Sequence, residues 1–137
     1  MGRPLAVLLP PAEADDREVA YYRERLEDPS LMAAGLAVLV DGFAYLAVPV
    51  GGGRRGGYLP MTELVTGLAV RSLLCGRPGF PDVRLRWSPY GDCCHVVEWG
   101  DRPPDDLDDV IHGRFYGYSA EAIAQALAWQ DNRAAHP

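Results

Sequence analysis

A single dipeptide, Asp41-Gly42, limits the folds open to this chain, because it joins two apolar runs, Leu36 to Val40 and Phe43 to Val50. Asp-Gly between apolar segments is the strongest short signal for a β-hairpin. When Val40 pairs with Phe43, both faces of this hairpin carry apolar side chains. Such a hairpin must be covered on both sides. We expect the cover to be a second copy of the chain, which predicts a homodimer, or a ligand, or the chain's own helices and N-terminal segment.

Three segments have the spacing of amphipathic helices. The first runs from about 13 to 26, and the third follows Ser119, a favourable N-cap residue. The second is capped by Thr62 and ends at Gly76. Gly67 in its middle indicates a close approach to a neighbouring element, because glycine costs about 1 kcal/mol relative to alanine there. The apolar residues that this second helix is expected to bury are Leu64, Val65, Leu68 and Leu73.

A second hairpin is predicted from Val83 to Trp87 and from Cys93 to Trp99, with a turn between them. The whole pattern predicts an α+β fold in the order α-ββ-α-ββ-α. It consists of a mostly antiparallel sheet of two hairpins packed on three helices, with a possible extra N-terminal strand at Leu5 to Leu9. We expect one domain over residues 1–137, with flexible ends at about 1–10 and 132–137.

Composition excludes several classes of chemistry. The chain has 137 residues and no lysine, and all 13 of its basic residues are arginines. Schiff-base catalysis, pyridoxal phosphate attachment and a P-loop lysine are therefore impossible. The formal net charge of −6 disfavours binding to the phosphate backbone of nucleic acids. We expect no nucleic-acid partner and no cofactor.

The N-terminus and the cysteines predict a cytoplasmic location. The apolar stretch from Leu5 to Leu9 is too short for a signal-peptide core or a membrane span. The cysteines are three in number and Cys93 adjoins Cys94, which indicates free thiols in a reducing compartment. No C-x-x-C pair is present, so we expect no metal site.

The glycine-rich segment from Gly51 to Gly57 contains Arg54 and Arg55. Backbone amides and two guanidinium groups could bind a phosphate or a carboxylate here. The match to the dinucleotide fingerprint is not convincing, because no helix follows directly and no acidic residue stands about twenty residues further on. A flexible loop with solvated arginines is the other interpretation.

The second candidate site lies between positions 93 and 99, which hold two thiols, an imidazole and a carboxylate. On a strand, Cys93, His95 and Trp99 share one face. Cys94 and Glu98 share the other face. Acid/base chemistry would use His95 or Glu98, and either cysteine could be a nucleophile. The candidate catalytic residues are therefore His95, Glu98, Cys93 and Cys94.

The register of the second hairpin decides what surrounds these groups. One register places Arg84 and Arg86 beside His95, forming a basic, aromatic face that could hold an anion. The other places both arginines beside Glu98, which then forms cross-strand ion pairs while His95 is buried. The sequence favours the second register, because Arg–Glu pairs are common on strands.

An acidic loop from Asp101 to Asp109 precedes a run that contains Arg114, Tyr116 and Tyr118. The loop lacks the spacing of an EF-hand and is interpreted as solvated. Arginine and tyrosine favour recognition surfaces, although they also pack at the rim of a core. The candidate ligand-binding residues of the whole chain are Arg54, Arg55, Arg84, Arg86, Tyr90, Trp99, Arg114 and Tyr116.

Several short motifs occur in order along the chain between Tyr22 and Ala128, and through them the chain resembles an uncharacterised family of small actinomycete (Streptomyces-type) proteins, a domain of unknown function. The resemblance implies an actinomycete source and no reaction or cofactor. The motifs that carry it are Pro49 to Tyr58, Gly79-Phe80-Pro81-Asp82, Arg86-Trp87-Ser88-Pro89-Tyr90, His95-Val96-Val97-Glu98-Trp99-Gly100 and Gly113-Arg114-Phe115-Tyr116-Gly117-Tyr118-Ser119.

Three functional hypotheses follow from the sequence. The first is a non-catalytic binding or regulatory domain that recognises an anionic small molecule or a partner protein through its arginine and aromatic residues. The second is a small enzyme of specialised metabolism that uses the candidate catalytic residues. The third is a protein that neutralises a specific factor through a flat apolar interface.

Overall fold

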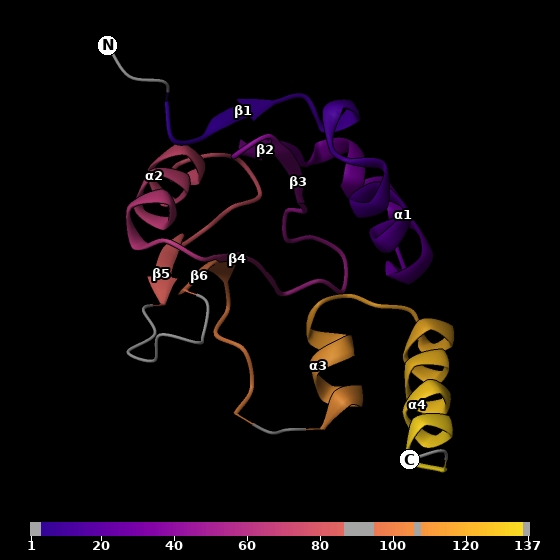
Figure 1. Ribbon diagram of the computed structural model, residues 1–137. Helices are drawn as coiled ribbons and strands as arrows, with labels where there is room; N and C mark the ends of the chain where they lie inside the picture. The colour runs from indigo at the N-terminus through magenta and orange to yellow at the C-terminus, as the bar shows by residue number, and fades with distance from the viewer. Residues whose placement is uncertain (1–3, 87–94, 106–107, 136–137) are drawn as a thin grey trace.

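Within the residues that the structure describes, the fold has two three-stranded antiparallel sheets and four α-helices (Figure 1). The computed structural model describes residues 4–86, 95–105 and 108–135. The strands are β1 (Val7–Leu9), β2 (Leu36–Val40), β3 (Phe43–Ala47), β4 (Gly56–Met61), β5 (Arg84–Arg86) and β6 (His95–Gly100). The helices are α1 (Asp16–Arg25), α2 (Leu64–Leu74), α3 (Asp109–Phe115) and α4 (Ala120–Ala135), and the short 3-10 helices are η1 (Pro11–Glu13) and η2 (Pro29–Ala34). The predicted α+β class is confirmed.

The first sheet has the order β1-β2-β3 and contains the predicted hairpin. Val40 pairs with Phe43, the register expected from the Asp41-Gly42 turn. Asp41 and Gly42 both have positive φ, as the two central residues of a type I′ turn require. The predicted extra N-terminal strand is present as β1, where Val7 pairs with Leu39.

Both faces of this hairpin are covered within the chain. One face contributes Val38 and Val40 to the larger hydrophobic core, which it shares with α2 and the second sheet. The other face contributes Ala37 and Leu46 to a smaller core under α1. Among the covers expected from the sequence, the structure shows the chain's own elements on both faces.

The second sheet has the order β4-β6-β5. β4 extends the predicted hairpin by a strand that the sequence did not reveal, because its glycines and Pro60 are poor strand residues. Proline is tolerated here because β4 is an edge strand. Arg84 pairs with Glu98, so the register that places the arginines beside Glu98 is confirmed.

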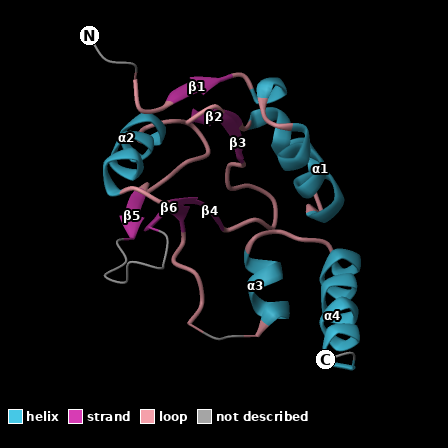
Figure 2. Ribbon diagram, viewed as in Figure 1, coloured by secondary structure: helices cyan, strands magenta, loops and turns pink. Residues whose placement is uncertain are grey.

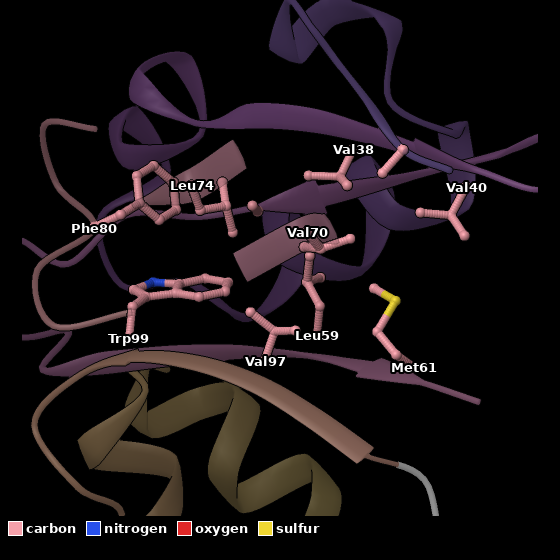
Figure 3. Close-up of a cluster of buried hydrophobic side chains, with 11 residues drawn as sticks. Val38, Val40, Leu59, Met61, Val70, Leu74, Phe80, Val97 and Trp99 are labelled. Carbon is pink, nitrogen blue, oxygen red and sulfur yellow. The ribbon is translucent and has the colours of Figure 1, made fainter. Parts of the chain in front are cut away.

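The inner face of the second sheet packs against the first sheet through the larger core (Figure 3). Trp99 is 1% exposed and meets the Phe80 ring edge-on, with ring centroids 5.1 Å apart. Its indole Nε1 donates a hydrogen bond to the Val48 carbonyl oxygen at 3.1 Å. Leu59 and Val97 complete this face of the sheet.

The predicted buried face of α2 is wrong in part. Leu64, Val65 and Leu68 are exposed, and the helix instead buries its side that carries Gly67 and Val70. A Cβ at Gly67 would lie 2.9 Å from Leu85 Cδ1, which confirms the predicted close approach. Gly67 lets the helix backbone come near the sheet, so that Val70 and Leu74 are buried while Leu64, Val65 and Leu68 are turned outward.

Of the remaining helices, α1 packs beside the first sheet, and α4 lies against α3 and α1 (Figure 2). α4 begins at the predicted position, with Ser119 accepting a hydrogen bond from the Ala122 amide. α1 begins at Asp16, about three residues later than predicted, with Asp15 accepting a hydrogen bond from the Arg17 amide. α3 was not predicted; the sequence placed its first residue in a loop. Asp108 caps it by accepting hydrogen bonds from the amides of Val110 and Ile111.

Two features are absent from the parts of the chain that the structure describes. No helix there is both long and apolar enough to cross a membrane. Nor is there a group of three or more histidine, cysteine, aspartate or glutamate side chains that could hold a metal ion among those residues.

Candidate ligand-binding site

A cleft lined largely by tyrosines lies between α1, α3 and α4, beside strand β4. It encloses about 400 Å³. We call it the tyrosine cleft. It is lined by Tyr21, Arg25, Tyr58, Asp109, His112, Gly113, Tyr116, Tyr118, Ala122, Ile123 and Ala126. Its size and its mixture of aromatic surface with a few polar groups are typical of small-molecule sites.

The aromatic rings of the tyrosine cleft support one another. The Tyr116 ring packs on Tyr58 at 5.4 Å and on Tyr118 at 6.2 Å between centroids. The Arg25 guanidinium carbon lies 3.8 Å from the Tyr21 ring centroid, a cation–π contact. These contacts limit the movement of the rings and thereby preform the cleft.

Burial keeps several of these phenols protonated. It raises the pKa of Tyr116 to about 12 and raises the pKa values of Tyr58 and Tyr118 as well. At neutral pH these hydroxyls are therefore uncharged and can both donate and accept hydrogen bonds.

Arg54 is the buried support behind the cleft. Only 3% of the residue is exposed, and its NH1 donates a hydrogen bond to the Tyr116 carbonyl oxygen at 2.8 Å. Its guanidinium carbon lies 5.7 Å from the Tyr22 ring centroid and 5.9 Å from that of Tyr116. Burial lowers the pKa of Arg54. Neither interpretation of the glycine loop fits this arginine, which is neither solvated nor presented to a ligand.

Two glycines allow α3 to sit where it does. A Cβ at Gly113 would lie 2.6 Å from Ile123 Cγ1, so only glycine lets α3 and α4 approach this closely. Gly117 has a φ of +75°, and a Cβ there would lie 2.7 Å from Arg54 Cβ. The turn after α3 therefore places Tyr116 against Arg54.

A second cavity of about 240 Å³ adjoins the tyrosine cleft and shares His112 and Tyr116 with it. We call it the charged cavity. It is lined by Arg86, Glu98, Arg102, Pro103, Pro104, Asp105, His112 and Tyr116. It lies on the outer face of the second sheet, where the cross-strand row Tyr58–Glu98–Arg84 carries polar side chains.

Glu98 is the most buried charge in this cavity, with 8% of its side chain exposed. Its Oε1 accepts a hydrogen bond from Arg84 Nε at 3.0 Å. Its Oε2 has no hydrogen-bond donor among the described residues, and Arg86 Nε lies 3.7 Å away. The carboxylate is thus compensated in charge but only half satisfied in hydrogen bonding.

The other predicted arginines have structural or solvent-exposed positions. Arg84 NH1 also donates to the Gly100 carbonyl oxygen at 2.8 Å, which holds its side chain in the sheet. Arg55 forms an exposed ion pair with Asp101 at 2.9 Å. Arg114 is exposed and lines neither cavity. Trp99 belongs to the hydrophobic core and does not face a ligand.

The candidate catalytic residues are not brought together. His95 and Glu98 stand three positions apart on β6, so their side chains leave opposite faces of the strand. Glu98 faces the charged cavity, whereas His95 is half-buried at the end of the strand's core face. Cys93, Cys94 and Tyr90 lie outside the described residues.

Sequence reasoning identified Tyr116, Arg86 and Glu98 but missed most of the cleft. The residues that it did not single out as a site are Tyr21, Arg25, Tyr58, Arg102, Asp109 and His112. The one available signal was the number of tyrosines, seven in the chain, of which four line this cleft. Their positions along the sequence have no period that would join them.

The fold and site define a small α+β protein with a preformed aromatic cleft that opens beside a charged cavity. The chain belongs to a family of unknown function (DUF6302), whose model matches residues 8–137. A search of curated proteins and a search of solved structures gave no match.

Proposed function

We propose that this protein is a non-catalytic binding domain for an aromatic small molecule that carries a carboxylate. The observation that carries the proposal is the tyrosine cleft of about 400 Å³ with the charged cavity at its side. An aromatic ring fits the first compartment, and an anionic group fits the second. The sequence predicts an anionic ligand in general terms, and the two compartments narrow this to a molecule with an aromatic ring at one end and an anionic group at the other.

The tyrosine cleft supports the aromatic part of the ligand. The rings of Tyr58, Tyr116 and Tyr118 contact one another and line the cleft, so together they offer aromatic surface against which a ligand ring can pack edge-on or offset. Ala122 and Ala126 form the small-residue wall on α4 and leave space for a ring. Because the surrounding rings already contact one another, little ordering is needed when the ligand binds.

Two arginines support the anionic part. Arg86 has 62% of its side chain exposed, and Arg102 is exposed at the other side of the charged cavity. Guanidinium groups bind carboxylates through paired hydrogen bonds, so these two are the natural partners of a ligand carboxylate.

Binding is favoured over catalysis by the state of the polar groups. The phenols of Tyr116 and Tyr118 are protonated at neutral pH, and burial raises their pKa further from neutrality, so neither of them is tuned to act as a base. His95 and Glu98, the acid/base pair of the enzyme hypothesis, leave opposite faces of β6. A flat interface would need no cavities, whereas two adjoin here.

The test is calorimetric titration with 3-phenylpropionate and related aromatic carboxylates. Ala126→Phe fills the tyrosine cleft from an exposed position on α4 and should weaken binding about tenfold or more, a loss of about 1.4 kcal/mol. Ala124→Phe is the matched control, because Ala124 is equally exposed on α4 but lines neither cavity. It should leave binding unchanged. If no aromatic carboxylate binds, or if both variants weaken binding equally, the proposed function is wrong.

A homodimer, a cytoplasmic location and an actinomycete source remain narrower proposals. The hairpin no longer argues for the dimer, because its faces are covered within the chain. The support that remains is the exposed apolar side of α2 with Leu64, Val65 and Leu68. Light scattering on the purified protein, with Val65→Glu as the variant, would detect such a dimer; a monomer at all concentrations would exclude it.

A further inference from the structure

We propose that the ligand's polar end is a zwitterion, in which an ammonium group binds Glu98 Oε2 while the carboxylate binds Arg86 and Arg102. This rests on the proposed function and specifies the substrate class of the same site: an aromatic amino acid or a molecule with the same charged end. The carrying observation is a carboxylate oxygen with no hydrogen-bond donor among the described residues, inside a cavity that adjoins an aromatic cleft.

Glu98 Oε2 requires a donor. A buried carboxylate oxygen that accepts no hydrogen bond carries a desolvation penalty, and a donor on a ligand removes that penalty. Only 8% of the Glu98 side chain is exposed. Its other oxygen, Oε1, already accepts a hydrogen bond from Arg84 Nε. Oε2 is therefore the acceptor that remains for a ligand, and a charged N–H group is the strongest donor for it.

The formal charges of the cavity select a zwitterion over a simple anion. Its lining holds two guanidinium groups, of Arg86 and Arg102, and two carboxylates, of Glu98 and Asp105. The two guanidinium groups suit a ligand carboxylate, and Glu98 Oε2, which remains without a donor among the described residues after Arg84 has bonded Oε1, suits an ammonium group. A lone carboxylate would leave Oε2 without a donor, and a lone ammonium would face two guanidinium groups.

The geometry allows the two ends of one molecule to reach both compartments. The cavities share His112 and Tyr116, so a molecule with its ring in the tyrosine cleft can extend past these two residues toward the charged groups. Arg86 Nε stands 3.7 Å from Oε2 with most of its side chain in solvent. It can turn toward a ligand carboxylate and uncover Oε2 for the ammonium.

The experiment compares three probes that differ by one charged group each. L-phenylalanine carries both groups, 3-phenylpropionate lacks the ammonium, and phenethylamine lacks the carboxylate. Calorimetric titration should give the tightest binding for phenylalanine, about tenfold tighter than 3-phenylpropionate, with phenethylamine weakest. Glu98→Gln keeps an oxygen for Arg84 but presents an amide donor, so it should abolish the preference for phenylalanine while 3-phenylpropionate still binds.

The outcomes separate the two proposals. If 3-phenylpropionate binds as tightly as phenylalanine to the unaltered protein, the zwitterion proposal is wrong and the proposed function stands. If none of the three probes binds, both fail. The comparison on the unaltered protein remains decisive even if the Glu98→Gln variant does not fold.

Discussion

The two sheets have the same strand number and the same antiparallel pairing but differ in what their outer faces do. The first sheet, β1-β2-β3, is covered by apolar side chains on both faces, with Val38 in one core and Leu46 in the other. The second sheet, β4-β6-β5, buries only its inner face in a core. On its outer face, Tyr58 lines the tyrosine cleft, Glu98 and Arg86 line the charged cavity, and Arg84 pairs with Glu98.

This difference assigns separate tasks to the two sheets. Apolar side chains on both faces make the first sheet a structural layer, because any polar group there would lose its hydration. The outer face of the second sheet holds charges that pair with one another and leaves space beside α3. Substitutions on the outer face of the first sheet should therefore lower stability. Substitutions on the outer face of the second sheet should mainly change ligand binding.

The largest effect is expected on the outer face of the first sheet. Leu46→Ala should lower the free energy of unfolding by about 2–5 kcal/mol, because the side chain is 1% exposed and its removal leaves a cavity. Chemical denaturation measures the change. Leu68→Ala on α2 makes the same substitution at a residue that is 38% exposed and should change stability far less. Equal losses in the two variants would show that this face of the sheet is not a core.

An intermediate loss of stability is expected from substitution of Arg54, the buried residue behind the tyrosine cleft. Arg54→Met should lower the free energy of unfolding by about 1–3 kcal/mol, because it leaves the Tyr116 carbonyl oxygen without its donor. It should also weaken binding of 3-phenylpropionate by loosening Tyr116. Arg55→Met is the control, since the Arg55–Asp101 pair is exposed at both ends and contributes little. A neutral Arg54→Met would refute the structural role of this arginine.

The smallest effect concerns alkaline pH. Burial raises the pKa of Tyr116 to about 12 from its ordinary value of 10.0, so the folded protein holds this proton more tightly than the unfolded chain. The resulting stabilisation is fully present below pH 10.0 and is lost as the pH rises toward about 12. Unfolding measured across this range should show the decline, and Tyr116→Phe should reduce it. A decline of the same size in Tyr116→Phe would assign it to other groups.

The sequence predicted the elements whose signals are local. The Asp41-Gly42 turn fixes the register of β2 and β3, because only residues that tolerate positive φ can form it. Ser119 marks the start of α4, since a cap acts on amides two or three residues away. The pairing of Arg84 with Glu98 followed from strand chemistry in the same way.

Tertiary structure alone decided the rest. β4 exists because β6 offers it a free edge, and nothing in its glycines and Pro60 favours a strand. The buried face of α2 was set by how closely Gly67 lets the helix approach the sheet, not by the hydrophobicity of Leu64 or Val65. Long-range packing outweighs local preference at such positions.

The candidate site shows the same division most clearly. From residue types alone, the sequence predicted arginines and aromatic residues as recognition groups and Glu98 as a catalytic candidate. Tyr116, Arg86 and Glu98 do line the cavities. Which arginines face a ligand depended on burial: Arg54 became a support and Arg84 was held by Glu98. The tyrosine cleft joins α1, β4, α3 and α4, elements distant in the chain. Only packing could bring these rings together, because contacts between distant segments leave no periodic pattern in the sequence.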